Sequence, residues 1–379
     1  MKKLVKILLC ATLILSCVFC FACTKTESED STPGLHYMKF KGDDYYTVYG
    51  YGAEDDVDVL DIGAIATEKN ITIGRIKTGA FDGNSSLTEI IVPDTVVEID
   101  EGAFKGMKSL KSITLPFVGG GAKADAFDSE TAKSEDKIVD SARLFGYVFG
   151  TEEYDDGAKI TQSYGDSDST VTYYIPKTLH TVTISPKDNY EIPMYAFYGA
   201  TNLYKVSFTD KVIAIGESAF YGCENLMTVG LKSTVKNIYA NAFNGCKSLA
   251  EYTEAKTTGI NLKDVSLDKI GEKAFVGTAI KNLEVSVSEI GSSAFAETSL
   301  VSVKLGNVKS IGANAFYNCK KITSLEIAFN NTDSKPSIYL SAFATTGDDG
   351  KINYNIDESA NKLTVASSDI DLSNVTIIK

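Results

Sequence analysis

Residues 215–226 read Ile-Gly-Glu-Ser-Ala-Phe-Tyr-Gly-Cys-Glu-Asn-Leu, and altered forms of this stretch recur along most of the chain. An Ala-Phe pair occurs in each copy, with the phenylalanines at positions 81, 104, 197, 220, 243, 275, 295, 316 and 343. Most neighbouring phenylalanines are 20 to 32 residues apart, whereas Phe104 and Phe197 are separated by 93 residues. A period of this length is typical of solenoids, in which each unit buries its apolar face against the next unit.

Each unit has the same internal pattern. An isoleucine precedes the phenylalanine by five residues, and in the fuller units an aliphatic residue follows it by six, as Leu87 follows Phe81. The pattern then continues as Leu87-x-x-Ile90-x-Val92, whose final alternation has the period of two expected of a strand with one buried face. Ala-Phe-x-Gly predicts a tight helical turn, because alanine permits close packing and glycine adopts a positive φ at little cost. The sequence therefore predicts a β-rich repeat solenoid.

These units resemble the BspA-type leucine-rich repeat, which is built on I-G-x-x-A-F-x-G-C-x-x-L-x-x-I-x-[IL]-P. The resemblance extends from about residue 35 to residue 345 and implies a leucine-rich-repeat-like right-handed superhelix with short strands and tight helical corners. It also implies a bacterial surface protein. The family's proline after the strand survives only at Pro93 and Pro116, and the units containing Phe275 and Phe295 are shorter, so we expect their curvature to differ.

The repeat pattern and the resemblance divide the chain into segments. Residues 45–52 resemble the family's N-terminal capping hairpin, and residues 144–150 with 174–176 resemble its irregular middle unit. We expect a signal peptide at 1–22, an acylated linker at 23–34, a capping hairpin unit at 35–75, regular repeats at 76–116, an irregular insertion at 117–190, regular repeats at 191–345 and a C-terminal cap at 346–379.

The first residues have the pattern of an export signal. A basic start with Lys2, Lys3 and Lys6 precedes a run from Ile7 to Ala22 that is apolar apart from two residues. This run is short for a stable membrane span, so a cleaved signal is favoured. Cys23 follows the small Ala22 and is our preferred lipid acceptor, with Cys17 and an unlipidated secreted protein as the alternatives. We expect an exported protein that is lipid-anchored to the bacterial cell membrane and exposed at the surface.

The charge balance argues against a nucleic-acid partner. The chain has 37 basic and 50 acidic residues, which gives a net charge of −13. Proteins that bind DNA or RNA usually carry clustered Lys and Arg residues, and no such cluster interleaved with aromatic residues occurs in this sequence. The hydrophobic content of 44% is sufficient for a substantial core.

The sequence predicts no catalytic residues, no cofactor and no metal site. Its only histidines are His36 and His180, which we interpret as structural or surface residues. No HExxH, paired CxxC, Walker loop or GxGxxG after a strand occurs. The acidic residues at 152–156 and 166–168 are interpreted as solvated loop charge, because they supply only a fragment of a calcium loop.

Three cysteines fall three residues after a repeat phenylalanine: Cys223, Cys246 and Cys319. Other units carry small or apolar residues there, so we expect buried thiols that act as compact hydrophobic groups. Cys223 and Cys246 belong to adjacent units about 5 Å apart, which leaves a disulfide open as an alternative.

Candidate binding residues are sought outside the core. The outward side of the predicted strands forms a stripe without aromatic residues, which we interpret as a plain solvated face because interface hot spots favour Trp, Tyr and Arg. Better candidates are the corner tyrosines Tyr198, Tyr221 and Tyr317, the first two of which should stack. The insertion at 117–170 is the other candidate, with Tyr154, Asp155 and Asp156 as the residues of interest.

The preferred function is therefore a cell-surface binding or adhesion lipoprotein that presents its solenoid to an extracellular protein or glycan. One alternative is a structural envelope spacer without a specific ligand. A second alternative is a hydrolase site within the 117–170 insertion.

Overall fold

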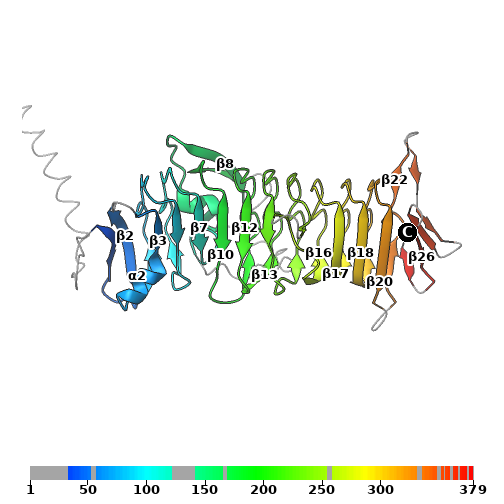
Figure 1. Ribbon diagram of the computed structural model, residues 1–379, viewed down its shortest axis with the longest axis horizontal. Helices are drawn as coiled ribbons and strands as arrows, with labels where there is room; N and C mark the ends of the chain where they lie inside the picture. The colour runs from blue at the N-terminus through cyan, green and yellow to red at the C-terminus, as the bar shows by residue number, and fades with distance from the viewer. Residues whose placement is uncertain are drawn as a thin grey trace, which may run out of the picture.

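The protein is a β-solenoid of about 11 turns, which stack along one long axis from the N-terminal strands to the C-terminal strands (Figure 1). This computed structural model describes residues 33–52, 57–121, 141–164, 169–253, 258–330 and 335–347, and most of 351–378 in short segments. The predicted repeat solenoid is confirmed. The proposed signal peptide, Cys17 and Cys23 lie outside the described residues. Within the described ranges, no helix is long and apolar enough to span a bilayer.

One side of the solenoid is a parallel sheet, here called the first sheet. Its strands, in spatial order, are β3 (Val59–Asp61), β5 (Glu89–Ile91), β7 (Ser112–Leu115), β10 (Thr181–Ile184), β12 (Lys205–Phe208) and β14 (Thr228–Gly230). One buried aliphatic residue of each turn lies in register with the next: Leu60, Ile90, Ile113, Val182, Val206 and Val229. The alternating pattern read from the sequence thus points every second side chain into the core, and β7, β10 and β12 each bury two.

The opposite side is a second parallel sheet. Its strands are β11 (Tyr190–Ile192), β13 (Val212–Ile215), β15 (Asn237–Ile238), β16 (Ser266–Ile270), β17 (Asn282–Ile290), β19 (Ser310–Ile311), β21 (Ser337–Tyr339) and β27 (Thr376–Ile378). The isoleucine that precedes each repeat phenylalanine forms a continuous row in this sheet, from Ile192 to Ile338. The two sheets therefore enclose the core between them.

The repeat phenylalanines form a ladder through this core. Phe197, Phe220, Phe243, Phe275, Phe295, Phe316 and Phe343 are buried, and neighbouring rings are 4.7 to 5.4 Å apart. Their planes differ by 1° to 20°, so they lie nearly parallel. Each ring fills the space between adjacent turns, and this contact explains why units of this kind are stable only when stacked.

The corners contain two positions with positive φ in most turns. The glycine of Ala-Phe-x-Gly has φ between 66° and 79° from Gly83 to Gly277, as expected. The residue two before the phenylalanine also has positive φ. It is glycine in the first two turns, at Gly79 and Gly102, but the later turns use non-glycine residues: Tyr195, Ser218, Asn241, Lys273, Ser293 and Asn314. This conformation costs a residue with a Cβ atom free energy.

The chain ends are covered by smaller sheets. At the N-terminus, β1 (Gly34–Met38) pairs antiparallel with β2 (Tyr46–Gly52), which leads into β4 (Ile73–Ile76) and β6 (Glu98–Ile99). A short helix, α2 (Ile62–Glu68), follows β3 and is capped by the Asp61 side chain. At the C-terminus lie β22 (Thr345–Thr346), β23 (Ile352–Asn353), β24 (Ile356–Asp357), β25 (Lys362–Val365) and β26 (Ser368–Asp371).

The long interval between Phe104 and Phe197 adds little to the length of the solenoid. It equals about four repeat lengths, yet β7 pairs directly with β10 in the first sheet. The missing rungs of the ladder are supplied by Phe149 and Phe145 of one 3₁₀ helix, η2 (Phe145–Phe149), which follows η1 (Ser141–Arg143). Phe149 contacts Phe104 at 6.2 Å and Phe145 contacts Phe197 at 4.9 Å, so η2 runs backward along the axis.

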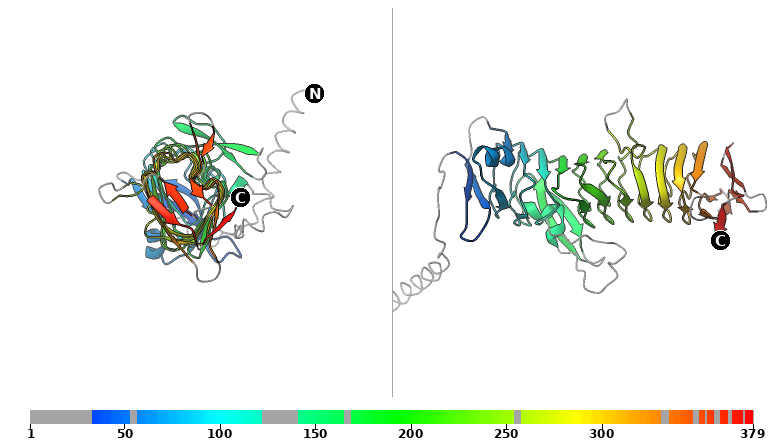
Figure 2. Two further views of the ribbon diagram at one scale, coloured as in Figure 1. Left: turned by 90° about the vertical axis from the view of Figure 1, so that its right-hand side faces the viewer. Right: turned by 90° about the horizontal axis from the view of Figure 1, so that it is seen from below.

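Residues 157–163 and 170–176 of this insertion form a hairpin outside the ring of stacked turns (Figure 2). Its strands are β8 (Gly157–Ser163) and β9 (Thr170–Pro176), which pair antiparallel. The buried Gln162 ties the hairpin to the core, since its Oε1 accepts from Gly146 N–H at 2.8 Å and its Nε2 donates to the Ala196 carbonyl at 3.1 Å.

The first sheet is interrupted after β14 and resumes with β17, β18 (Ser302–Val308) and β20 (Ser324–Phe329). In this part the units are shorter, and β17 runs without a corner from one sheet into the other. Its residues 282–286 pair with β18 in the first sheet, and Glu289 and Ile290 pair with β16 and β19 in the second.

Candidate binding groove

Two of the three predicted corner tyrosines lie together. The rings of Tyr198 and Tyr221 are 5.0 Å apart and within 6° of parallel, so the expected stacking is confirmed. Tyr195 packs edge-on against Tyr198 at 5.8 Å. Tyr317 occupies the same corner position but lies four turns from Tyr221, and its hydroxyl is hydrogen-bonded to Thr346. The structure therefore does not bring the three tyrosines into one site, and their role in binding stays a prediction.

The acidic residues of the insertion are engaged in separate surface interactions. Glu152 pairs with Lys105, Glu153 accepts a hydrogen bond from the Tyr174 hydroxyl at 3.3 Å, and Lys177 lies 3.9 Å from Asp156. Asp155 is exposed. No group of three His, Cys, Asp or Glu residues that could hold a metal ion occurs in the part of the chain that the structure describes.

Tyr154 is half-buried beside this acidic stretch. Its hydroxyl has no hydrogen-bond partner among the described residues, and burial raises the pKa of Tyr154 above its ordinary value. Asp166 and Asp168, which we interpreted with residues 152–156 as solvated loop charge, lie outside the described residues. Tyr154, Asp155 and Asp156 line neither of the two grooves described below, and their binding role stays a prediction.

The three cysteines of the repeats are free and buried. The thiols of Cys223, Cys246 and Cys319 donate to the carbonyls of Phe197, Phe220 and Phe295 at 3.0 to 3.1 Å. Burial raises the pKa of Cys223 to about 12, which keeps the thiol protonated at neutral pH. The expectation of buried thiols is confirmed, and the alternative Cys223–Cys246 disulfide is absent from the structure.

A groove lies where the first sheet is interrupted. The unit from Phe243 to Phe275 has 32 residues, nine more than each of the two units before it. The extra residues displace the strand: Ile260 bridges to both Val229 and Glu251. Among the residues that the structure describes on either side, no backbone hydrogen bond joins residues 258–264 to residues 282–285 of β17. Because the backbone ladder is missing here, the surface is hollowed.

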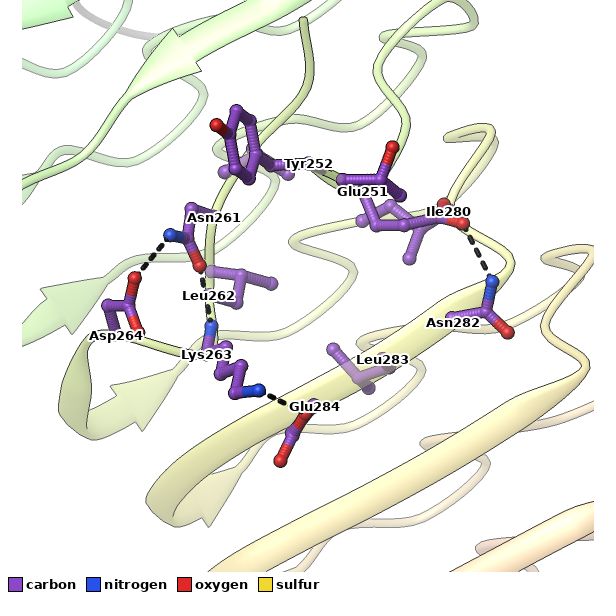
Figure 3. Close-up of a pocket in the computed structure, with 12 residues that line it drawn as sticks. Glu251, Tyr252, Asn261, Leu262, Lys263, Asp264, Ile280, Asn282, Leu283 and Glu284 are labelled. Atoms are coloured by element: carbon purple, nitrogen blue, oxygen red, sulfur yellow. Dashed lines mark hydrogen bonds and ion pairs between the residues drawn. The ribbon is translucent and has the colours of Figure 1, made fainter. Parts of the chain in front are cut away.

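The groove has a volume of about 360 Å³ (Figure 3). Its floor is apolar and consists of Ile260, Leu262, Ile280 and Leu283, each no more than 5% exposed. Tyr252 lies on one side of the opening and is 43% exposed, opposite Leu283 on β17. An apolar floor beside an accessible aromatic ring is typical of ligand sites.

Polar side chains form the rim. The Glu251 carboxylate accepts from Lys281 N–H at 2.9 Å and from Asn282 Nδ2 at 2.8 Å, which ties residue 251 to the start of β17. Asn261 Nδ2 donates to Asp264 Oδ2 at 2.6 Å. These interactions hold planar amide and carboxylate groups at fixed positions around the opening.

Three charged side chains, Lys263, Glu284 and Lys304, lie side by side from the rim across β17 to β18. Glu284 lies 3.5 Å from Lys263 and 3.1 Å from Lys304, and the hydrogen bond from Lys304 lowers the pKa of Glu284. A second groove of about 370 Å³ lies directly beside the first and shares Lys263 and Glu284 with it. The two grooves thus extend from residues 251–264 over β17 and β18 to β20.

The sequence did not predict this site. Glu251, Thr253, Asn282 and Glu284 belong to the outward stripe that we interpreted as a plain solvated face, and they line the first groove. That interpretation is wrong at the interruption. The stripe contains no aromatic residue, but Tyr252 lies between two of its members and is exposed because the strand is displaced. The sequence feature that could have indicated the groove is the interval of 32 residues between Phe243 and Phe275.

A model of the BspA type leucine rich repeat region matches this chain in six copies, at residues 66–136, 172–261 and 251–362. No curated protein matches it. Similar solved structures include a leucine-rich repeat protein from Bacteroides ovatus ATCC 8483, with 17% identity, a TM-score of 0.34, and coverage of 82% of this chain and 85% of that one. A leucine rich cell surface protein from Faecalibacterium prausnitzii A2-165 has 18% identity, a TM-score of 0.30, and coverage of 93% and 95%. A leucine-rich repeat protein from Eubacterium ventriosum ATCC 27560 has 17% identity, a TM-score of 0.32, and coverage of 84% and 97%.

Proposed function

This chain belongs to the BspA type leucine-rich repeat family, and from that premise we propose that it is an exported, surface-exposed binding protein whose ligand occupies the groove beside β17. The observation that carries the proposal is the groove itself, in which an apolar floor, one exposed tyrosine and fixed polar groups meet at an interruption of the first sheet. The ligand is an extracellular protein or glycan.

The rest of the first sheet supports this choice of location. From β10 to β14 the outward residues are mostly small and uncharged, such as Thr181, Thr183, Ser207 and Gly230. A flat surface of this kind gives a ligand few contacts, whereas a concave site removes much more of a ligand's surface from water. The groove is therefore a better binding site than the flat part of the same sheet.

Attachment to the membrane forms part of the proposal. The basic start, the apolar run to Ala22 and the polar residues after Cys23 support export and acylation at Cys23. The first described strand begins at Gly34, so about ten residues separate the proposed anchor from the solenoid. Mass spectrometry of the native protein tests this point: a diacylated or triacylated Cys23 is expected, and an unmodified N-terminus contradicts it.

The binding function is tested with one blocking variant and one matched control. Asn282 on β17 and Thr181 on β10 each stand one residue before a buried aliphatic residue, Leu283 and Val182. Asn282→Arg places a long side chain across the groove, whereas Thr181→Arg adds the same charge to the flat part of the first sheet. Binding of the labelled protein to an array of matrix proteins and glycans is then measured.

We expect saturable binding that Asn282→Arg removes and Thr181→Arg retains. The spacer alternative predicts no saturable partner, together with an altered envelope when the protein is deleted. The hydrolase alternative predicts an assayable hydrolytic activity that replacement of Asp155 and Asp156 by alanine abolishes. Saturable binding that persists in Asn282→Arg would move the site away from the groove, and the stacked pair Tyr198 and Tyr221 would be the next region to test.

A further inference from the structure

We propose that the groove binds an uncharged oligosaccharide, with one sugar ring stacked on Tyr252. This inference rests on the proposed binding function and specifies the chemistry of its ligand. A sugar ring has an apolar face of C–H groups and an edge of hydroxyl groups. A site for it therefore needs an aromatic or apolar surface together with polar groups at the edge.

Tyr252 supplies the aromatic surface. It is 43% exposed although the repeat pattern places a buried residue three positions after Leu249. The face of an aromatic ring is electron-rich, so it attracts the weakly positive C–H groups of a sugar. The buried side chains of Leu262 and Leu283 provide the apolar floor below the ring.

The rim supplies the polar groups. Glu251, Asp264, Asn261 and Asn282 present planar carboxylates and amides around the opening (Figure 3). A carboxylate has about four acceptor positions, and a side-chain amide has two donor hydrogens. The hydrogen bonds within the rim occupy only part of this capacity: Glu251 accepts one bond at each oxygen, from Lys281 N–H and Asn282 Nδ2. The remaining positions can accept from and donate to neighbouring sugar hydroxyls.

The charge of the rim selects against anionic ligands. Glu251, Asp264 and Glu284 contribute three carboxylates, and Lys263 is the one lysine among the residues that line the groove. The chain as a whole carries a net charge of −13. Sulfated, phosphorylated or uronic-acid-rich chains would meet repulsion both locally and from the overall field. An anionic ligand is therefore excluded, and the hydroxyl-rich, uncharged sugars remain within the proposal.

The size of the site favours an oligosaccharide over a single sugar. The first groove of about 360 Å³ is at the small end of ligand pockets, and the adjoining groove of about 370 Å³ continues over Ser286, Gly306 and Ala328. Adjacent strands are about 4.8 Å apart, a step comparable to the advance of one sugar along an extended chain. A chain of several sugars can thus cross β17, β18 and β20 from one groove to the next.

The test measures binding of defined oligosaccharides to the purified full chain by isothermal titration calorimetry. The probes are uncharged hexasaccharides of glucose, mannose and N-acetylglucosamine, with heparin as a polyanionic comparison and a ten-residue Ser/Thr-rich extended peptide as the competing ligand class. The variants are Tyr252→Ala, Tyr252→Phe, Asn282→Arg and Tyr339→Ala. Tyr339 is the matched control, since it is 37% exposed on β21 in the second sheet.

We expect at least one uncharged hexasaccharide to bind and heparin not to bind. Tyr252→Ala should weaken the affinity about tenfold or more, because the stacking surface is lost. Tyr252→Phe, which keeps the ring, and Tyr339→Ala should remain within about twofold of the native protein. Circular dichroism of each variant checks that the solenoid is intact.

The possible outcomes separate this inference from the proposed function. Binding of heparin alone, or hexasaccharide binding that Tyr252→Ala leaves unchanged, overturns the saccharide site. Peptide binding that Asn282→Arg removes, with no hexasaccharide bound, overturns the saccharide class and keeps the groove as the binding site. Failure of every probe to bind, together with array binding that Asn282→Arg leaves intact, removes both proposals.

Discussion

Two regions depart from the repeat, and they do so in opposite ways. The 93-residue interval between Phe104 and Phe197 keeps the first sheet continuous, because β7 pairs directly with β10 and the β8–β9 hairpin lies outside the ring. The 32-residue unit between Phe243 and Phe275 keeps the phenylalanine ladder, with its rings 5.3 Å apart, but breaks the first sheet. A long insertion that returns to register leaves the surface flat, whereas a short one that displaces a strand creates a groove.

The largest expected effect is a loss of stability when the phenylalanine ladder is broken inside the insertion. Phe145 is fully buried between Phe149 and Phe197, and it should be as important to stability as Phe220 in a regular turn. Phe145→Ala and Phe220→Ala should each cost about 3–5 kcal/mol, measured by urea denaturation with tyrosine fluorescence. Tyr339→Ala, at an exposed position, should cost little. A near-neutral Phe145→Ala would show that η2 is not part of the core.

A smaller loss of stability is expected when Gln162, which attaches the hairpin to the stacked turns, is replaced. Gln162→Met keeps the side-chain volume but leaves the buried Gly146 N–H without its acceptor, while the Ala196 carbonyl keeps the bond from Phe145 N–H. The expected cost is about 1–3 kcal/mol. Hydrogen exchange at residues 145–149 should accelerate in this variant. The same acceleration in Thr161→Val, at an exposed position of β8, would assign the effect to the hairpin in general rather than to Gln162.

A gain in stability is expected at the corner that closes the 32-residue unit. Lys273 has a φ of 53°, which strains any residue with a Cβ atom. Lys273→Gly should stabilise the protein by about 0.5–1 kcal/mol, since relief of strain exceeds the added entropy of the unfolded chain. Gly277→Ala, at a φ of 74° in the same turn, should have the opposite sign. Thermal unfolding measures both effects: the midpoint should rise in Lys273→Gly and fall in Gly277→Ala. A lower midpoint in Lys273→Gly would show that this corner is unstrained.

The smallest effect concerns the charged group at the groove. The hydrogen bond from Lys304, together with the charge of Lys263, holds the pKa of Glu284 below its ordinary value. The folded state is therefore stabilised by ionised Glu284 at neutral pH, and this contribution is lost as the pH falls through that lowered pKa. Lys304→Met should move the Glu284 titration to higher pH in a carboxyl-carbon NMR experiment. An unchanged titration would show that the ion pair does not form in solution.

The sequence predicted those parts of the fold that recur in every repeat unit. The isoleucine row, the phenylalanine ladder and the buried cysteines follow from positions that recur in each unit, because each turn must match its neighbours to bury its core. The groove does not recur. Exposure of Tyr252 depends on where the chain returns after residue 253, and that depends on which residue, Tyr252 or Ile260, pairs with Val229. Local alternation cannot distinguish these two registers.

The reversal of η2 was equally hidden from the sequence. Phe145 and Phe149 lie four residues apart on one short helix and fill two rungs of the ladder in reverse order. Residues 144–150 resemble the family's irregular middle unit, but the repeat pattern contains no Ala-Phe pair there, so it did not show that the two rings continue the ladder in reverse order. The interval of 93 residues was predicted as one irregular insertion, and its described part supplies two aromatic side chains to the ladder and one hairpin outside the ring.

The direction of the hydrogen bonds in the two sheets has a mechanical consequence. The strands run around the axis, so the bonds between turns point along it, and a force applied to the two ends of the rod loads the turns in series. The weakest junction opens first, and the remaining turns stay folded. Each regular turn of 23 residues, once released, extends by roughly 75–80 Å. A protein built in this way lengthens stepwise under tension, and the interrupted sheet between β14 and β17 is where its first step is expected.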